Sequence, residues 1–123
     1  MEQQYLVFNT KTELLRLEVS KIVYFEGDGN YTQIVTANKL KTVVCLNLTQ
    51  MEKYLSEKLS DGCHVFMRIG KRFIVNTSYI YQINIHKQQL ILSDYDHFAF
   101  ALGISKDALR QMKELLVAKK TEF

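Results

Sequence analysis

The residues best suited to bind a charged partner lie between positions 68 and 76. Arg68, Lys71 and Arg72 place three cations within five residues, with no acidic residue among them. An arginine can bridge two acceptor atoms of guanine, and arginine or lysine can pair with a phosphate. A glycine at position 70 would let the backbone turn sharply and approach another chain closely. The charge pattern alone is equally compatible with a basic hairpin that only contacts solvent.

The histidines and cysteines do not form a recognisable metal or catalytic motif. His64, His86 and His97 are not paired at a spacing typical of metal ligands. Cys45 and Cys63 lie 18 residues apart, and a secreted disulfide scaffold of this size would usually carry more cysteines. We therefore expect two reduced thiols, no metal, no cofactor and no enzyme activity.

Two acidic or glycine-rich segments are better explained as turns than as reactive sites. Asp94 and Asp96 flank Tyr95 in a polar stretch, whereas a catalytic carboxylate pair needs burial and facing geometry. The segment 26–30, Glu-Gly-Asp-Gly-Asn, lacks the length and the Gly-Lys-Ser/Thr ending of a phosphate-binding loop. Its two glycines predict a tight turn with positive φ angles. For Glu26 we expect a structural role, holding this loop through backbone N–H groups.

The bulk composition is that of one globular domain. The chain has 123 residues, 47% of them hydrophobic and 24% charged, and its net charge is +3. This charge permits nucleic-acid binding without arguing for it. The sequence shows no signal peptide and no apolar run long enough to cross a membrane, so we expect a cytoplasmic protein. We expect a single domain over 1–123 with its core at about 5–117.

Hydrophobic periodicity predicts the elements that must position the basic segment. Alternating or apolar runs predict strands over 5–8, 13–19, 21–25, 31–36, 40–46, 65–69, 73–75, 79–85, 90–92 and 98–102. Apolar residues at helical spacing predict a helix over 48–59, capped either by Asn47 or by a capping box at 49–52, and stopped by the Ser-Asp-Gly at 60–62. A closing helix begins after Ser105 as its N-cap. The fold class expected is mainly β, an elongated arrangement of antiparallel sheets (about ten strands) with one short central helix and a C-terminal helix.

The basic segment also resembles the signature of the LytTR family of DNA-binding domains, the output domains of response regulators. The family pattern is Phe-x-Arg-Ile/Val-His-Arg/Lys-Ser-aromatic-aliphatic-Val-Asn, and the chain reads Phe-Met-Arg-Ile-Gly-Lys-Arg-Phe-Ile-Val-Asn over 66–76. Gly70 replaces the usual histidine and Arg72 the usual serine. Further landmarks follow the family order over roughly 5–117, namely Ile22 to Glu26 with Asn30-Tyr31, Leu48 with Met51-Glu52 and Leu55, Ile80 with Ile83, and Ser105-Lys106.

The resemblance implies how such a domain would act. Family members read DNA through loops that enter successive major grooves, and the DNA bends. Carried onto this chain, the predicted contacts fall on three loops and on two further residues of the signature. They are Asn30, Tyr31, Thr32, Arg68, Gly70, Lys71, Arg72, Asn76 and Lys106. The departures at Gly70 and Arg72 alter the middle loop, where an imidazole is lost and a guanidinium is gained.

The resemblance also implies partners. We expect double-stranded DNA with repeated half-sites, bound with modest affinity by one module and more tightly by a homodimer. Family members usually follow a receiver domain, for which there is no room before Tyr5. The chain is therefore either a stand-alone regulator or part of a longer one, with a receiver domain or histidine kinase as partner. The alternative is a β-rich protein-interaction module without DNA binding, whose strand edges form the contact surface.

Overall fold

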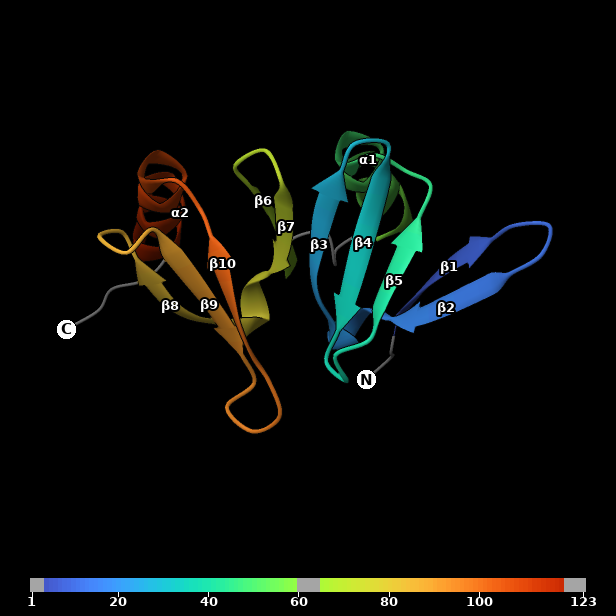
Figure 1. The fold of residues 1–123 in the computed structure, drawn as a ribbon, viewed down its shortest axis with the longest axis horizontal. Coiled ribbons are helices and arrows are strands. Elements are labelled where there is room, and N and C mark those ends of the chain that lie inside the picture. Colours follow the sequence, from blue (N-terminus) through green and yellow to red (C-terminus); the bar gives the residue numbers. More distant parts are fainter. Residues whose placement is uncertain (1–3, 60–64, 119–123) are drawn as a thin grey trace.

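The computed structural model describes residues 4–59 and 65–118, and these contain ten strands and two α-helices (Figure 1). The elements in chain order are β1 (Tyr5–Asn9), β2 (Leu14–Glu18), β3 (Ile22–Asp28), β4 (Tyr31–Thr36), β5 (Lys41–Val44), α1 (Leu48–Lys58), β6 (Phe66–Ile69), β7 (Phe73–Asn76), β8 (Ile80–Asn84), β9 (Gln89–Ser93), β10 (Ala99–Gly103) and α2 (Lys106–Ala118). The expected fold class is therefore confirmed. None of the described helices is long and apolar enough to cross a membrane.

The strands form three antiparallel sheets. The central sheet has five strands in the order β5-β4-β3-β7-β6, while β1-β2 is a separate hairpin and β10-β9-β8 a three-stranded sheet. Strand β3 pairs with β4 from Tyr24↔Val35 to Asp28↔Tyr31, and with β7 from Tyr24↔Val75 to Glu26↔Phe73. A long connection through α1 thus returns the chain to the far side of β3.

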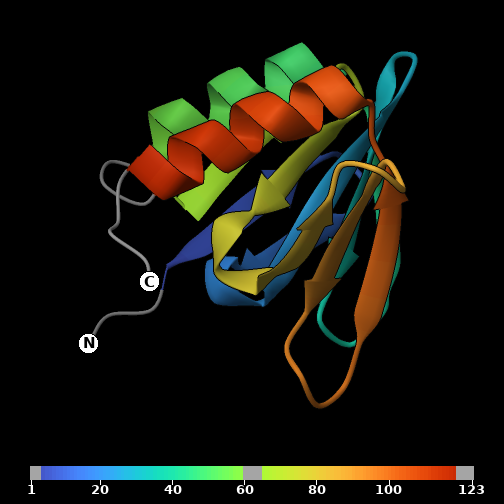
Figure 2. The same ribbon diagram turned by 90° about the vertical axis from the view of Figure 1, so that its left-hand side faces the viewer.

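The central sheet is covered on both faces, and each face has its own hydrophobic core. One core contains Phe25, Ile34 and Ile74 of the sheet, packed against α1 and the β1–β2 hairpin. The other contains Val35 and Val75 of the same strands, packed against α2 and the three-stranded sheet. Figure 1 shows α1 and α2 on opposite sides of this sheet, and Figure 2 shows their axes running in nearly the same direction. Side chains alternate between faces along a strand, which explains why these strands read as continuous apolar runs.

Helix α1 begins with a complete capping box at Asn47. The Asn47 side chain accepts a hydrogen bond from the Gln50 N–H, and the Gln50 side chain accepts one from the Asn47 N–H. The alternative box at 49–52 is therefore wrong, because the helix has already begun at Leu48. The expected stop at 60–62 lies outside the described residues, and α1 ends before it at Lys58.

Helix α2 begins as expected after Ser105. The Ser105 hydroxyl accepts a hydrogen bond from the Ala108 N–H at 3.3 Å, which satisfies one of the unpaired donors of the first turn. Leu109 and Met112 are buried against the three-stranded sheet and against strands β6 and β7.

The turn expected over 26–30 is shorter than the sequence suggested. Strand β3 continues through Glu26 and Gly27 to Asp28, so the turn consists of Gly29 and Asn30 alone. Gly29 has a φ of +62°, as expected, whereas Gly27 lies within strand β3 and not in the turn. A Cβ at Gly27 would lie 3.0 Å from the Leu48 Cβ, so its glycine lets the start of α1 pack closely onto β3.

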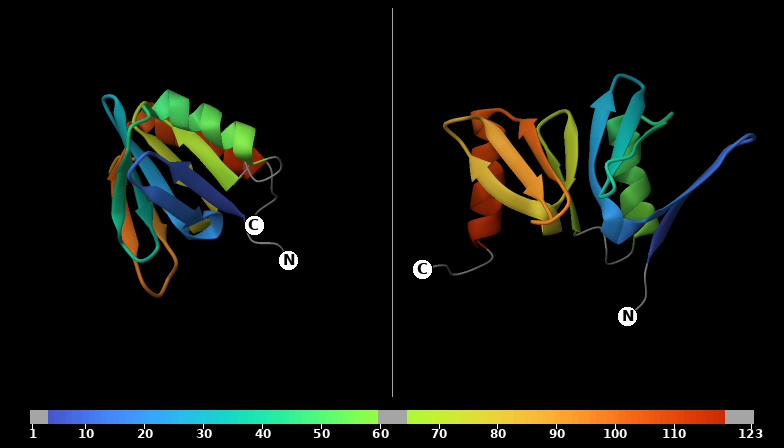
Figure 3. Two further views of the ribbon diagram at one scale, coloured as in Figure 1. Left: turned by 90° about the vertical axis from the view of Figure 1, so that its right-hand side faces the viewer. Right: turned by 60° about the horizontal axis from the view of Figure 1, so that its bottom comes forward.

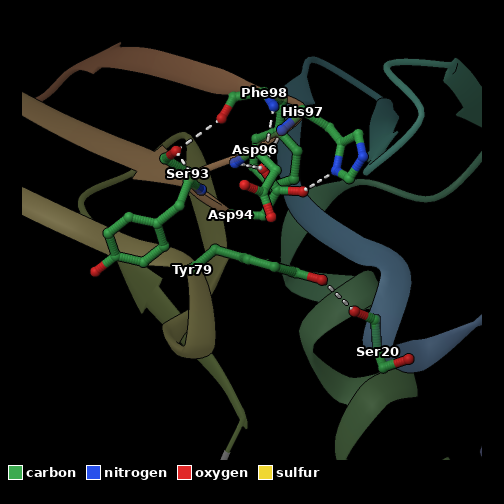
Figure 4. A network of polar contacts seen from close by, with 8 residues as sticks. Ser20, Tyr79, Ser93, Asp94, Asp96, His97 and Phe98 are labelled. Carbon is green, nitrogen blue, oxygen red and sulfur yellow. Dashed lines mark hydrogen bonds and ion pairs between the residues drawn. The ribbon is translucent and has the colours of Figure 1, made fainter.

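A polar turn closes the β9–β10 hairpin, as Figure 4 shows. One Asp94 carboxylate oxygen accepts hydrogen bonds from the N–H groups of Asp96, His97 and Phe98 at 2.7–3.1 Å, and the other lies 2.9 Å from the His97 Nδ1. The expectation of a turn rather than a catalytic pair is confirmed for these carboxylates. Burial alone would raise the pKa of Asp94, but its hydrogen bonds with His97, Phe98 and Asp96 outweigh burial and hold this pKa well below its usual range.

We expect Asp94→Asn to lower the melting temperature by a few degrees at pH 7. A carboxyl whose pKa is depressed by folding stabilises the protein above the pKa of the unfolded chain, about 4, and loses this effect as the pH falls further. The gap between wild type and variant should therefore shrink below about pH 4, as measured by thermal unfolding across pH. Asp96→Asn is the matched control, because the Asp96 carboxylate has no hydrogen bond among the described residues. Equal shifts in the two variants would contradict this account.

Candidate nucleic-acid interface

Three connections that carry the predicted contact residues lie along one edge of the molecule. They are the β3–β4 turn, the β6–β7 turn and the start of α2, at the upper edge in Figure 1 and the upper right in Figure 2. The Gly27 N–H donates to the Arg72 carbonyl oxygen at 2.8 Å, which joins the first two connections. A Cβ on Gly70 would lie 3.8 Å from the Ala108 Cβ, which places the second connection against the first turn of α2.

The β6–β7 turn presents its basic residues to solvent. Ile69 pairs with Phe73, and residues 70–72 form the turn between them. Gly70 has a φ of +63°, a left-handed conformation that a side chain would strain, so the expected sharp turn at this glycine is confirmed. Lys71 is exposed, and its ammonium has no hydrogen bond or ion pair within the described part of the chain.

Arg68 lies below this turn and binds the protein itself. Its guanidinium donates to the Glu52 carboxylate at 3.0 Å and to the Lys71 carbonyl oxygen at 3.3 Å, with a longer contact to the Thr49 hydroxyl at 3.4 Å. Its buried Nε has no hydrogen-bond partner among residues 4–59 and 65–118. Arg68 therefore ties the basic turn to α1, which makes it a positioning residue for Lys71.

Arg72 projects from the turn but is not an isolated cation. Its guanidinium forms an ion pair with Glu26 on the neighbouring strand β3 and lies 5.6 Å from the centre of the Phe73 ring. The Arg72 side chain is 67% exposed, while that of Glu26 is 25% exposed. The expectation that Glu26 holds its loop through backbone N–H groups is not seen; its carboxylate instead binds a cation 46 residues away.

The β3–β4 turn contributes polar and aromatic groups. Asn30 is exposed at its tip, and Tyr31, which follows it, is 50% exposed. Thr32 is different, because it is buried and its hydroxyl donates to the Leu46 carbonyl oxygen at 2.6 Å. This bond fixes the connection that leads from β5 into α1.

The start of α2 contributes an exposed Lys106. Its neighbour Asp107 lies 3.4 Å from Arg110, one turn further along the helix. The N-terminus of a helix favours anions, because its first N–H groups are unpaired and its dipole is positive there. A cation and a helix N-terminus thus lie beside the basic turn.

The structure separates the nine predicted contact residues by exposure. Asn30, Tyr31, Gly70, Lys71, Arg72 and Lys106 are exposed, and their connections lie along the same edge, whereas Arg68 is partly buried. Thr32 and Asn76 are buried, so neither side chain is on the surface that DNA could reach. The Asn76 amide donates to the Ile22 carbonyl oxygen at 2.8 Å and accepts from the Ser78 N–H at 2.9 Å, which ties β7 to β3 and to the turn that follows.

Sequence reasoning missed the partners that set the two arginines. Glu52 is 16 residues from Arg68 in sequence, and no periodic pattern relates positions so far apart in different elements. The exposed Lys87 was not among the predicted contacts. It lies in the β8–β9 turn, where the Gln88 carbonyl oxygen accepts a hydrogen bond from the Ile104 N–H just before α2.

The described residues contain no group of three or more His, Cys, Asp or Glu side chains that could hold a metal ion. Cys63 and His64 lie outside the described residues. The exposed groups along this edge are the cations of Lys71, Arg72 and Lys106, the Asn30 amide and the Tyr31 phenol, all of which can form hydrogen bonds or ion pairs with a partner.

The sequence profile of the LytTr DNA-binding domain matches residues 12–117. The chain belongs to the LytTr DNA-binding domain family. This family is one of DNA-binding domains rather than enzymes, and membership assigns the chain a DNA-binding role in transcription regulation.

Two relatives of known function are similar to the LytTr chain. They are the heme-containing CO-sensing transcriptional regulators RcoM 2 and RcoM 1 of Paraburkholderia xenovorans (strain LB400), each 27% identical over 106 residues. The alignment covers 86% of this chain but only 37% of each regulator. What the remaining parts of those regulators do is therefore not carried over to this chain.

A solved structure of the family has the same fold. The LytTr DNA-binding domain of a Bacillus cereus protein superposes with a TM-score of 0.62 at 21% sequence identity, covering 91% of this chain and 95% of that one. The likeness of fold extends over nearly the whole of both chains.

We expect Arg68→Lys to loosen the β6–β7 turn without unfolding the protein. Lysine keeps the charge but cannot bind Glu52 and the Lys71 carbonyl oxygen together as a guanidinium does. Backbone order parameters of Lys71 and Arg72, measured by NMR relaxation, should fall from about 0.85 toward about 0.6. Arg110→Lys is the control, because Arg110 pairs with Asp107 and not with the turn. A turn as rigid as in the wild type would show that Arg68 does not position it.

Proposed function

We propose that this domain binds double-stranded DNA sequence-specifically by placing three connections in successive major grooves. These are the β3–β4 turn, the β6–β7 turn and the start of α2, which together are called the basic edge. The β6–β7 turn is the central contact, the β3–β4 turn lies on one side of it and the start of α2 on the other. The proposal includes a cytoplasmic location, where bacterial DNA is found.

The observation that carries this proposal is that residues distant in sequence converge at one edge. Gly70 to Arg72 contact both the end of β3 and the first turn of α2. The exposed groups there are of the types that contact DNA. They project from elements that pack on the two hydrophobic cores of the central sheet. Loops held on rigid elements position side chains well enough to discriminate bases.

The exposed residues divide by chemistry. Lys71 and Lys106 have no competing carboxylate among the described residues, so we assign them to phosphates, which set the register of the complex. Arg72 and Asn30 have the geometry for bidentate contacts with base edges, guanine for arginine and adenine for asparagine. Thr32 and Asn76 are not part of the proposed contact set, and Arg68 acts through the turn.

A single module has few unpaired cations at this edge, which predicts modest affinity. Two modules bound to repeated half-sites would combine their contacts, so we propose a homodimer on DNA. In a longer regulator, a receiver domain or a histidine kinase would control this pairing.

We expect Lys71→Ala with Arg72→Ala to weaken DNA binding about tenfold or more. The test uses a duplex enriched from random sequences, with affinity measured across salt concentrations. Each lost phosphate contact should reduce the slope of log affinity against log salt by about one. The melting temperature should change by only a few degrees, because both side chains are exposed.

The matched control is Lys21→Ala with Lys41→Ala, which removes two exposed cations from the other end of the central sheet. This pair should leave the affinity nearly unchanged. The proposal fails if enrichment yields no preferred sequence and binding does not depend on salt. A collapse of folding in the first variant would instead show that these side chains are structural.

We expect Glu26→Gln to strengthen binding to random duplexes several-fold and to reduce sequence discrimination. The substitution removes the carboxylate that competes with DNA for Arg72, so the guanidinium can reach any phosphate. Asp28→Asn removes a nearby negative charge without releasing Arg72, and so it reports general electrostatics. Identical effects of both substitutions would show that the ion pair does not tune recognition.

A further inference from the structure

The β8–β9 turn, residues 85–88, holds an exposed lysine on a hydrogen-bonded backbone. The Lys87 N–H donates to the Asn84 side-chain oxygen at 3.0 Å, and the Gln88 N–H donates to the Ile85 carbonyl oxygen at 3.1 Å. Gln88 has a φ of +54°, a left-handed conformation that costs energy for a residue with a side chain. The hydrogen bonds around Gln88 hold the turn in this conformation, so the Lys87 side chain projects into solvent from a fixed position.

This turn is a direct neighbour of the start of α2. The register of the three-stranded sheet places Asn84, Gln89 and Gly103 side by side at one end of the sheet. The Ile104 N–H, between β10 and α2, donates to the Gln88 carbonyl oxygen at 3.1 Å. In the right-hand view of Figure 3, the turn lies in line with the start of α2, the β6–β7 turn and the β3–β4 turn. Figure 1 shows it on the far side of the start of α2 from the β6–β7 turn. The β8–β9 turn therefore continues the basic edge beyond α2.

The charges around the turn favour an anionic partner. The turn itself contains no acidic residue, and it lines a hollow with Arg110, Lys113 and Glu114 of α2. The other carboxylate near the start of α2 belongs to Asp107, which already pairs with Arg110 at 3.4 Å. With Lys87 included, these side chains comprise three cations and two carboxylates, so their balance is positive.

The Lys87 charge is available to a partner. Its ammonium has no hydrogen bond or ion pair among residues 4–59 and 65–118, and the same holds for Lys106 on the adjacent connection. A lysine ammonium is a flexible point charge, which suits a phosphate better than the patterned edge of a base.

We propose that the β8–β9 turn is a fourth DNA contact, in which the Lys87 ammonium binds a backbone phosphate beside the groove that receives the start of α2. This inference rests on the proposed function of the basic edge and extends it to a connection for which the family resemblance implied no contact. Phosphate contacts set register but carry no sequence information. Lys87 therefore strengthens binding and fixes the start of α2 on the DNA without changing the preferred sequence.

The test compares the wild-type chain with Lys87→Ala on a duplex enriched from random sequences. Lys87→Ala should bind about fivefold more weakly at about 0.15 M salt, because each neutralised phosphate contributes a slope of about −0.9 in log affinity against log salt. The slope itself should be reduced by about one, and the preferred sequence should stay the same. The melting temperature should not change, since the Lys87 side chain is exposed.

A series of duplexes, each with one uncharged methylphosphonate in place of a phosphate, locates the contact. At the phosphate that Lys87 binds, the replacement should weaken wild-type binding about fivefold and leave Lys87→Ala binding nearly unchanged. This phosphate should differ from any that is coupled in the same way to Lys71.

Lys39→Ala is the matched control, because Lys39 is also an exposed lysine in a turn, at the end of the central sheet remote from the basic edge. It should change neither the affinity nor the slope. An unchanged slope in Lys87→Ala, an altered preferred sequence, or a series in which no phosphate is coupled to Lys87 would each overturn this inference. In those cases the weaker binding of the Lys71→Ala, Arg72→Ala variant would leave the proposed basic edge standing. A wild-type chain that selects no duplex would refute both.

Discussion

Strand β3 buries side chains on both of its faces, and the rest of the structure depends on this. Ile22 and Phe25 lie in the core beneath α1, while Val23 and Tyr24 lie in the core beneath α2 and the three-stranded sheet. A register irregularity between Ile22 and Tyr24 allows two successive residues to share one core. A strand buried on both faces needs cover from both sides, which α1 and the β1–β2 hairpin supply on one side and α2 and the three-stranded sheet on the other. A truncation of Phe25 would cost about 3–5 kcal/mol, a large part of the stability of such a domain.

The same strand organises the basic edge. Because β4 and β7 both pair antiparallel to β3, the turn after β3 and the turn before β7 must lie at the same end of the sheet. Helix α2 packs on the second core with its N-terminus at that end. Ion pairs between neighbouring elements then hold the two arginine side chains. Glu52 binds Arg68, and Glu26 binds Arg72. In the proposed complex, the fold thus sets where the contacts lie, and the carboxylates of Glu52 and Glu26 on neighbouring elements bind two of the basic side chains.

Much of the fold could be predicted from local patterns, whereas the roles of single side chains could not. Alternation and apolar runs identified every strand to within a few residues, because these patterns reflect which faces are buried. Gly29 and Gly70 were predicted as turn glycines and have positive φ, but Gly27 is a packing glycine whose partner Leu48 lies in another element. The family resemblance predicted contacts in the three connections, and it placed Thr32 and Asn76 among them. Both are polar residues next to loops, yet both are buried to satisfy backbone groups from distant segments, which no local pattern reveals.

The proposed DNA-binding edge consists of the β3–β4 turn, the β6–β7 turn and the start of α2. The most direct measurement is a titration of the isotopically labelled chain with an enriched duplex, followed by amide chemical shifts. Large shifts should appear at Gly29 to Tyr31, Gly70 to Arg72 and the first turn of α2, with the β4–β5 and β9–β10 turns unchanged. Shifts concentrated at the β4–β5 and β9–β10 turns, with the three connections unaffected, would contradict the account.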